Sequence, residues 1–471
     1  MAAMETQPPA MGQVVTPSGR DYDKARRIWN ERFDCHPRAI IYPRDVREVA
    51  AAVGHVRDNS IPFRIRSGGH NVEGFCVVDD GIVIDLSRLT SIAVSNYRTR
   101  ATIGPGVLLG DVYANLWSAG VTIPAGVCPD IRIGGHVLGG GVGMLVRSRG
   151  MLVDSLLGLT MVDARGRIME VDDHRHPDLM WACRGGGGGN FGIVTSYTFR
   201  TRPITDVTLV VVKWDWADGI AVLDAWQHWI LDADKRVNSR FTLYPSATGT
   251  AMMTVLFEGP ADEWEAVARP LVGRYPPREY SARTMPFIDS VGAFSERVPS
   301  IRAKFVPALA AGPLDEPALK TLERWHMDAP AGVKTGFYGL GGAVLGGAMA
   351  ENSAFAHRDA LFCVEYLGHW ANPRDDSEHL EWLAGIRDEM HEFMTGGAYI
   401  NSPDRDLSNW LHAYYGDNLP RLMDVKRRYD QHDVFKFEQS IPTSISLADA
   451  KTAGLTHAVI ADLHDRGLIA A

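Results

Sequence analysis

The sequence lacks the features that mark several common protein classes. Its five cysteines are scattered and form no CxxC pair, which argues against a zinc ribbon, a thioredoxin-like site or a disulfide framework. It contains no run of about 18 apolar residues and no apolar segment near its start, so we expect neither a membrane span nor a secretory signal. Acidic residues (57) outnumber Lys and Arg (48), and a net charge of −9 gives no electrostatic reason to bind nucleic acid or anionic lipid. We therefore expect a cytoplasmic protein.

Most short catalytic motifs are also missing. The sequence has no GxSxG, HExxH or GxxxxGK[ST], no carboxylate spacing that singles out a glycosidase, and no cluster that predicts a metal site. A GxGxxG match does occur over Gly187–Gly192. The dinucleotide fingerprint needs a helix after its glycines, whereas the strand-like run 193–199 follows here. We interpret this match as accidental.

The chain is long enough for two or three domains, and its texture changes at Pro203. The boundaries we expect are an N-terminal arm over 1–35, a first α+β domain over 36–204, a second domain over 205–398, a closing segment over 399–442 and a helical tail over 443–471. Within the arm, residues 1–20 read as loose. Apolar periodicity predicts helices over 44–59, 107–118, 178–183, 221–231 and 262–272, strands over 61–66, 82–84, 193–199, 207–216, 241–244 and 251–258, and a hairpin over 159–171.

The tail carries an apolar stripe. Leu455, Val459 and Leu463 recur every four residues, which predicts one amphipathic helix. This stripe needs a cover, either the body of the protein or a second copy of the chain, so a homodimer stays open.

Glycine is the residue in excess, at 47 of 471, about 10% against a usual ~7%. One group follows a strand, in Arg66-Ser67-Gly68-Gly69-His70-Asn71, and a second places six glycines in the ten residues 134–143, shortly after Cys128-Pro129. Glycines at this density favour backbone wrapped against a large polar ligand such as a diphosphate. Taken alone, the histidine could equally be solvated and the cysteine a small buried hydrophobe.

Taken together, these segments resemble the FAD domain of berberine bridge enzyme-like flavoproteins, of the vanillyl-alcohol oxidase/p-cresol methylhydroxylase (PCMH) superfamily. The resemblance rests on the motifs at 66–71, 124–129, 134–143 and 185–195 and on the closing run from Tyr414 to Ile441. It implies an α+β fold, with a two-subdomain FAD-binding domain of PCMH type and a substrate domain whose antiparallel sheet is covered by helices. It also implies FAD attached twice, to His70 and to Cys128. The other cofactor-binding residues it implies are Arg66, Ser67, Gly68, Gly69, Asn71, Pro129, Ile131, Gly134, Gly135, His136, Gly139, Gly140, Gly143, Gly192, Ile193, Val194, Tyr415 and Asn418.

Two departures from the family pattern bear on chemistry. Arg132 stands where glycine is common, and it could contact a phosphate or reach solvent. Ser402 stands where carbohydrate-oxidising relatives carry a tyrosine base, and a serine hydroxyl cannot take a proton without a base of its own. Tyr399, Glu365 or Tyr366 could fill that role, although Tyr366 could equally be core.

The resemblance implies an FAD-dependent oxidoreductase that oxidises an alcohol or amine of a small natural product or glycoside, with oxygen or another acceptor taking the electrons. Ile131 would lie near flavin C4a and slow the reaction with oxygen. Two alternatives stay open: an oxidative cyclase, which the change to Ser402 favours, and a binding or resistance protein without redox turnover.

Overall fold

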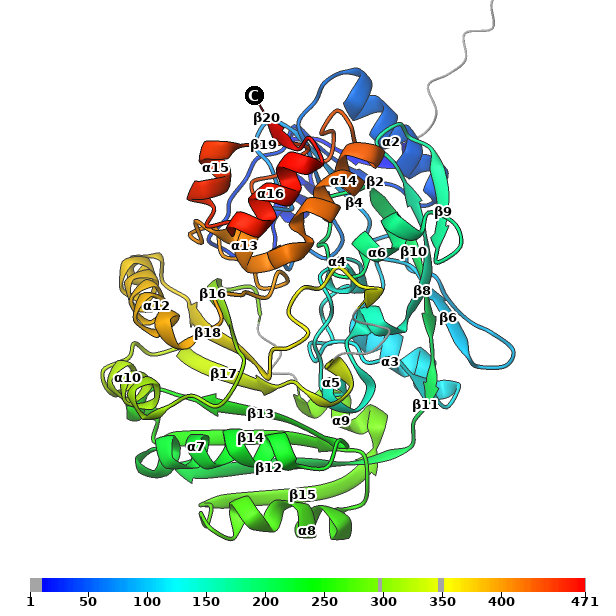
Figure 1. Cartoon of the computed structure of the whole chain (residues 1–471). Coiled ribbons are helices and arrows are strands. Elements are labelled where there is room, and N and C mark those ends of the chain that lie inside the picture. Colours follow the sequence, from blue (N-terminus) through cyan, green and yellow to red (C-terminus); the bar gives the residue numbers. More distant parts are fainter. Residues whose placement is uncertain (1–10, 295–298, 346–350, 471) are drawn as a thin grey trace, which may run out of the picture.

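The computed structural model describes residues 11–294, 299–345 and 351–470. The chain builds an N-terminal half with two small sheets and a second half around one large sheet (Figure 1). This mixture of helices and largely antiparallel sheets confirms the α+β class. Residues 1–10 of the expected arm and Ala471 of the expected tail lie outside the described residues.

The first sheet has the strand order β1-β2-β4-β3. Strands β2, β4 and β3 pair in parallel, and β1 pairs antiparallel with β2, with Val14 opposite Ile41. The expectation of a loose arm over 1–20 is therefore wrong from Gln13 onward. Three residues are too few to show the alternation of a strand in the sequence, and they form a strand only because they pair with β2. The elements are β1 (Gln13–Val15), α1 (Tyr22–Arg26), β2 (Ala39–Tyr42), α2 (Val46–Asp58), β3 (Phe63–Arg66) and β4 (Ile82–Asp85).

The second sheet is antiparallel, in the order β5-β6-β10-β8-β9. Strand β10 begins directly after the glycine run, so the GxGxxG match is indeed followed by a strand. The predicted hairpin is confirmed as β8 and β9. The elements are β5 (Ile92–Val94), β6 (Arg100–Ile103), α3 (Leu109–Ser118), β7 (Val121–Thr122), α4 (Ile133–Leu138), α5 (Val146–Arg149), β8 (Leu156–Val162), β9 (Ile168–Asp172), α6 (Pro177–Cys183), β10 (Ile193–Arg200) and β11 (Arg202–Pro203).

The third sheet has seven antiparallel strands in the order β15-β12-β14-β13-β17-β18-β16. Helices pack on one face of it, where Val364 and Tyr366 join a core with the helix residue Trp226. Side chains alternate along a strand, so Glu365 points to the opposite, open face. The elements are β12 (Asp206–Asp215), α7 (Trp216–Asp232), β13 (Val237–Leu243), β14 (Thr250–Phe257), α8 (Ala261–Val272), β15 (Glu279–Pro286), α9 (Phe287–Phe294), β16 (Arg302–Ala310), α10 (Glu316–Met327), β17 (Val333–Gly339), β18 (Phe362–Trp370) and α12 (Asp376–Met390).

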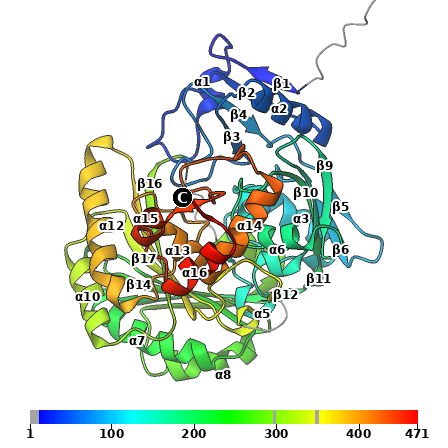
Figure 2. The ribbon, with the colours of Figure 1, turned by 45° about the horizontal axis from the view of Figure 1, so that its top comes forward.

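After the large sheet the chain returns to the N-terminal half. Helix α14 contacts α6 and α16, and Figures 1 and 2 both place α14 and α16 side by side. A buried Lys426 secures this return, since its ammonium donates to the carbonyls of Asn190 (3.0 Å) and Phe435 (2.6 Å) and to the carboxylate of Asp430 (2.7 Å). The elements are α13 (Trp410–Tyr415), α14 (Leu419–Tyr429), β19 (Ile445–Ser446), α15 (Leu447–Thr452), α16 (His457–Asp465) and β20 (Ile469–Ala470).

The tail is covered, as its stripe requires, but it is not one helix. Val459 and Leu463 lie in α16, whereas Leu455 precedes this helix in the turn after α15. All three side chains are buried in the largest core cluster of the chain. Gly454, in the left-handed region (φ 68°), separates the two helices, and the sequence reasoning did not weigh it.

We expect the tail to stabilise the body of the protein. Leu463 is fully buried, so Leu463→Ala should lower the free energy of unfolding by roughly 2–5 kcal/mol. Leu447→Ala, on a half-exposed side chain of the same tail, is the matched control and should change it little. Truncation after Pro442 should lower the melting temperature or change the oligomer size in gel filtration. If both values stay unchanged, the tail contributes nothing to the fold.

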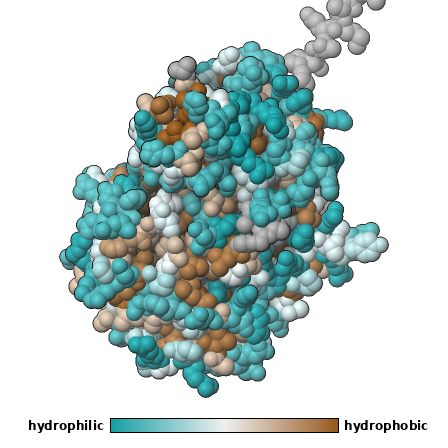
Figure 3. All heavy atoms as spheres, in the orientation of Figure 1, coloured by the Kyte–Doolittle hydropathy of each residue, from teal (hydrophilic) through white to brown (hydrophobic). Residues whose placement is uncertain are grey.

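The face shown in Figure 3 is largely hydrophilic, with apolar residues in several small patches. Within the described part of the chain, every helix is too short or too polar to cross a bilayer.

Candidate active site

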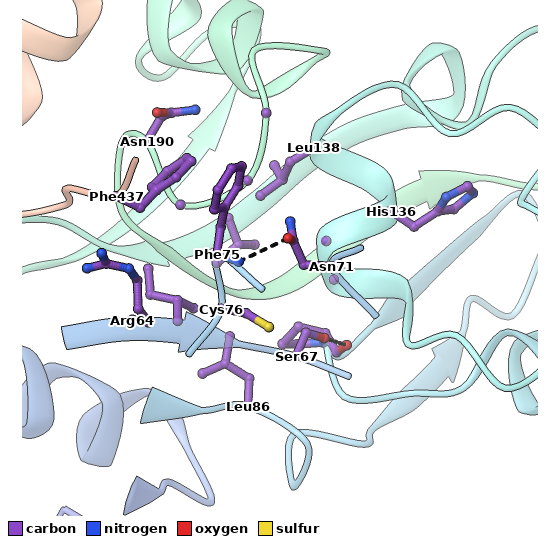
Figure 4. A pocket seen from close by; sticks show the side chains of 18 of the residues that line it. Arg64, Ser67, Asn71, Phe75, Cys76, Leu86, His136, Leu138, Asn190 and Phe437 are labelled. Atoms are coloured by element: carbon purple, nitrogen blue, oxygen red, sulfur yellow. Dashed lines mark hydrogen bonds between the residues drawn. The ribbon is translucent and has the colours of Figure 1, made fainter. Parts of the chain in front are cut away.

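One large pocket lies in the N-terminal half, between the two small sheets and under the returning C-terminal segment. Counted to its open mouth, it holds about 1470 Å³ of empty space. Figure 4 shows Phe75 and Phe437 side by side on its wall, with Asn71 accepting a hydrogen bond from the Phe75 N–H (3.0 Å). Of the residues expected to bind the cofactor, the pocket is lined by Ser67, Gly68, Gly69, His70, Asn71, Ile131, Gly134, Gly135, His136, Gly192, Ile193 and Val194.

The glycine loops expose backbone donors to this pocket. Among the described residues, no group accepts a hydrogen bond from the N–H of Gly69, His70 or Asn71, nor from those of Gly188 and Gly189. All five residues line the same pocket, and backbone N–H groups gathered in this way can bind an anionic ligand. The left-handed backbone at Gly69 (φ 69°) and Gly189 (φ 79°) explains why glycine is needed there. These loops therefore fit the diphosphate of FAD.

The ring of His70 packs against the ring of Trp29. The two rings stack at 5.1 Å with an angle of 19° between their planes, and the Trp29 N–H donates to the Gly69 carbonyl (3.0 Å). Trp29 belongs to the segment that extends the large sheet, because Asn30 forms a parallel bridge with Ile301 beside β16. Burial lowers the pKa of His70 to about 4, with Asp130 opposing it, so the imidazole is neutral at pH 7. A neutral ring nitrogen is free to act as a nucleophile.

Cys128 is half-buried, and the large sheet supplies its charged surroundings. Burial raises the pKa of its thiol. The charges of Arg240 and Lys334 oppose that rise, and those of Glu365 and Asp130 add to it. The charge of Asp130 contributes to the pKa shift of both His70 and Cys128.

The open face of the large sheet carries the candidate acid–base group, Glu365. The Ser402 hydroxyl donates to Glu365 Oε1, so a candidate base lies beside Ser402. The Tyr338 hydroxyl accepts a long hydrogen bond from Arg240 Nη1 (3.5 Å). Burial raises the pKa of Glu365, and the hydrogen bond from Ser402 and the charges of Arg240 and Lys334 only partly offset it. A carboxylate with a raised pKa suits proton transfer near neutral pH.

The structure places the two tyrosine candidates away from this group. Tyr366 lies on the helix-covered face, and its hydroxyl is buried without a partner among the described residues. Tyr399 is buried in a separate core cluster. Its hydroxyl accepts hydrogen bonds from the N–H groups of Gly141 and Val142 and from Asn401 Nδ2, each at 3.0 Å. Tyr399 therefore anchors the closing segment to the second glycine loop, and neither tyrosine faces Glu365.

Several residues implied to contact the cofactor lie outside the pocket lining. Arg66 pairs with Asp85 at 2.5 Å beneath the loop. A side chain at Gly143 would collide with the Ala125 carbonyl, so this glycine serves close backbone packing. Asn418 donates to the Ala354 carbonyl (3.2 Å). The others outside the lining are Cys128, Pro129, Gly139, Gly140 and Tyr415.

Two further expectations are corrected in detail. The backbone of His136 lines the pocket, but its ring points away in Figure 4 and packs where a side chain at Gly126 or Gly141 would lie. Arg132 lines the pocket too, and it donates to the carbonyl of Gly106. It is thus neither a purely solvated side chain nor one aimed only at a phosphate.

Sequence reasoning missed the residues that distant segments contribute. Trp29, Arg240 and Tyr338 belong to no motif, and only the tertiary structure brings them to the site. Gly187–Gly189 also line the pocket. These glycines belong to the motif at 185–195 that carries the family resemblance, which is the signal that points to them.

An open pocket between two small sheets, lined by glycine loops and covered by a third sheet, fits a nucleotide cofactor. Residues 37–172 match the family model "FAD binding domain", and residues 398–442 match "Berberine and berberine like". The chain is 36% identical to an uncharacterized FAD-linked oxidoreductase of Bacillus subtilis, YgaK, over 92% of this chain and 97% of that one. It is 32% identical to the aclacinomycin-N/aclacinomycin-A oxidase of Streptomyces galilaeus, over 92% and 90%.

Among solved structures, Physcomitrella patens BBE-like 1 superposes with a TM-score of 0.85 at 27% identity, covering 91% of this chain and 96% of that one. The chain belongs to the berberine bridge enzyme-like family of FAD-linked oxidoreductases. It is an FAD-dependent oxidoreductase with the PCMH-type fold.

Proposed function

We propose that this enzyme holds FAD by two covalent bonds, to His70 and Cys128, and oxidises an alcohol or amine of a natural product or glycoside. When bound, FAD supplies the hydride acceptor at N5 and passes the electron pair to oxygen, which yields hydrogen peroxide. The observation that carries the proposal is a pocket lined by the neutral His70 and by Asn401 and Pro403, which flank Ser402 in the chain, while Ser402 donates to Glu365. The relative named as an aclacinomycin oxidase supports a natural-product substrate.

In this proposal Glu365 removes the proton from the substrate hydroxyl while the neighbouring carbon loses its hydride. Ser402 orients the carboxylate through its hydrogen bond. A small molecule would enter between the pocket and the open face of the large sheet. An oxidative cyclase could use the same site without any further nucleophile from the chain. It would differ only in its substrate, which would carry a nucleophile of its own.

The test is anaerobic reduction of the purified yellow protein by a library of alcohols, sugars and alkaloids. Bleaching of the flavin by one class, followed by peroxide release in air, supports the proposal. A colourless protein, or a flavin that no alcohol or amine reduces, contradicts it and favours the binding or resistance alternative.

We also predict that Ile131 slows the reaction with oxygen. Ile131 lines the pocket and packs against the core. Isoleucine has one methylene more than valine, which leaves less free space in a close-packed wall. Ile131→Val should therefore speed reoxidation of the dithionite-reduced enzyme in air, measured by stopped-flow absorbance. Ile133→Val, at a fully buried position outside the lining, is the matched control and should leave the rate unchanged. Equal rates for wild type and Ile131→Val would show that Ile131 is no gate.

A further inference from the structure

Arg240 stands on the open face of the large sheet, in the row next to Glu365. In β13 it lies opposite Tyr338 of β17, which in turn lies opposite Cys363 of β18. Residues paired across antiparallel strands share a face, and Glu365 lies two residues from Cys363 on that same face. Arg240 and Glu365 therefore point into the same space.

The guanidinium of Arg240 lacks the acceptors that a buried arginine needs. Its Nε is shut off from solvent and has no partner among the described residues. Its Nη1 makes only a long contact with the Tyr338 hydroxyl, 3.5 Å, and the guanidinium carbon lies 5.7 Å from the centre of that ring. In the described part of the chain, no carboxylate lies within ion-pair distance of it.

Other arginines of this chain have firm acceptors, although Arg66 Nη1 and Arg358 Nε, like Arg240 Nε, have no partner among the described residues. Arg66 pairs with Asp85, and Arg358 pairs with Asp154 at 2.7 Å. Arg147 has no acidic partner, yet its guanidinium donates to backbone carbonyls that include Leu340 (3.0 Å). A buried donor without an acceptor is costly, and native structures leave few without a purpose. Arg240 differs from the others in having neither a carboxylate nor a carbonyl acceptor among the described residues, and a bound ligand can supply one.

A second cation makes this part of the open face positive. Lys334 of β17 lies opposite Leu367 of β18, hence on the same face as Arg240, and its ammonium is 5.8 Å from the centre of the Tyr244 ring. Between Lys334 and Tyr338 stands Gly336, where an added side-chain carbon would meet only ordinary contacts at 3.8 Å. Gly336 thus places no side chain between the two cations.

We infer that the substrate carries an acidic group, a carboxylate or an equally planar anion, which the guanidinium of Arg240 binds beside Glu365. This inference rests on the proposed oxidation and narrows its substrates to acidic alcohols, such as hydroxy acids or glycosides that carry a carboxylate. A guanidinium matches a carboxylate with two parallel N–H···O bonds, which a compact ammonium cannot do. Arg240 would thereby set which alcohol is placed against the base.

The test uses benzoate as a planar anion and benzamide as its neutral counterpart, each titrated into the holoenzyme by calorimetry and by the change in flavin absorbance. The wild type should bind benzoate about 10- to 100-fold more tightly than benzamide, as a charge-assisted bidentate contact predicts. Arg240→Met should abolish this preference, and Arg240→Lys should retain part of it. Arg236→Met, on an exposed arginine already paired with Asp234 and Glu263, is the control and should keep the preference.

Melting temperatures of both Arg240 variants show whether they fold, and Arg240→Lys keeps the test decisive if Arg240→Met does not. Equal binding of benzoate and benzamide by the wild type overturns the inference. So does an Arg240→Met variant that keeps the preference while its flavin spectrum or reduction potential shifts, because Arg240 would then bind the flavin. A third outcome separates this inference from the proposed function. If the enzyme retains its flavin and binds benzoate more tightly than benzamide, yet no alcohol or amine reduces the flavin, the proposed oxidation is wrong and the anion site is supported.

Discussion

Glu365→Gln is expected to lower the rate of flavin reduction by substrate about 10²- to 10⁴-fold, the usual contribution of a general base. Glutamine keeps the shape of the side chain and can still accept the hydrogen bond from Ser402, but it cannot take a proton. The measurement is anaerobic stopped-flow bleaching under a saturating substrate. Tyr366→Phe is the matched control, because its hydroxyl is buried in the core without a partner among the described residues. That variant should reduce at the wild-type rate.

The pH profile gives the same prediction a second readout. Burial raises the pKa of Glu365 above its ordinary 4.5, and only the ionised carboxylate can act as a base. The rate in the wild type should therefore rise with pH through this elevated pKa and fall away below it, whereas Glu365→Gln should show no such limb. A Glu365→Gln enzyme that reduces within a few-fold of wild type would assign the base elsewhere.

The double variant His70→Ala/Cys128→Ala is expected to release all of its FAD on acid precipitation. Each single variant should keep one bond and therefore retain the flavin. Peptide mass spectrometry should then locate the flavin on the Cys128 peptide in His70→Ala and on the His70 peptide in Cys128→Ala. The reason is that the family resemblance implies attachment at His70 and Cys128, and that His70, a neutral imidazole, lines the pocket.

Cys76→Ala is the matched control for attachment. Cys76 also lines the pocket, where burial raises the pKa of its thiol to about 11, but it belongs to none of the motifs that imply attachment. This variant should keep both links. A wild type that shows only the mass of the apoprotein would refute covalent attachment while leaving FAD binding itself intact.

The sequence by itself determined the parts that local chemistry dictates. Helix α2 follows from an apolar period and from Asp45, whose side chain caps Arg47 N (2.8 Å) and Glu48 N (3.0 Å). Each glycine loop is one continuous stretch of the chain, and His70 and Cys128 each lie close to one of these loops. Their short motifs were therefore enough to assign the family and the FAD. These features depend mainly on residues that are close together in sequence, so a sequence pattern can identify them.

Only the tertiary structure decided which of the candidate side chains lie together at the site. Glu365 and Tyr366 are neighbours in sequence and were equal candidates, yet the pleat of β18 sends one to the open face and the other into the core. Trp29 reaches His70, and Arg240 joins the surroundings of Glu365, because sheet pairing brings together segments that no short motif links. Which face of a strand is covered depends on helices elsewhere in the chain, and that is why periodicity alone could not choose the base.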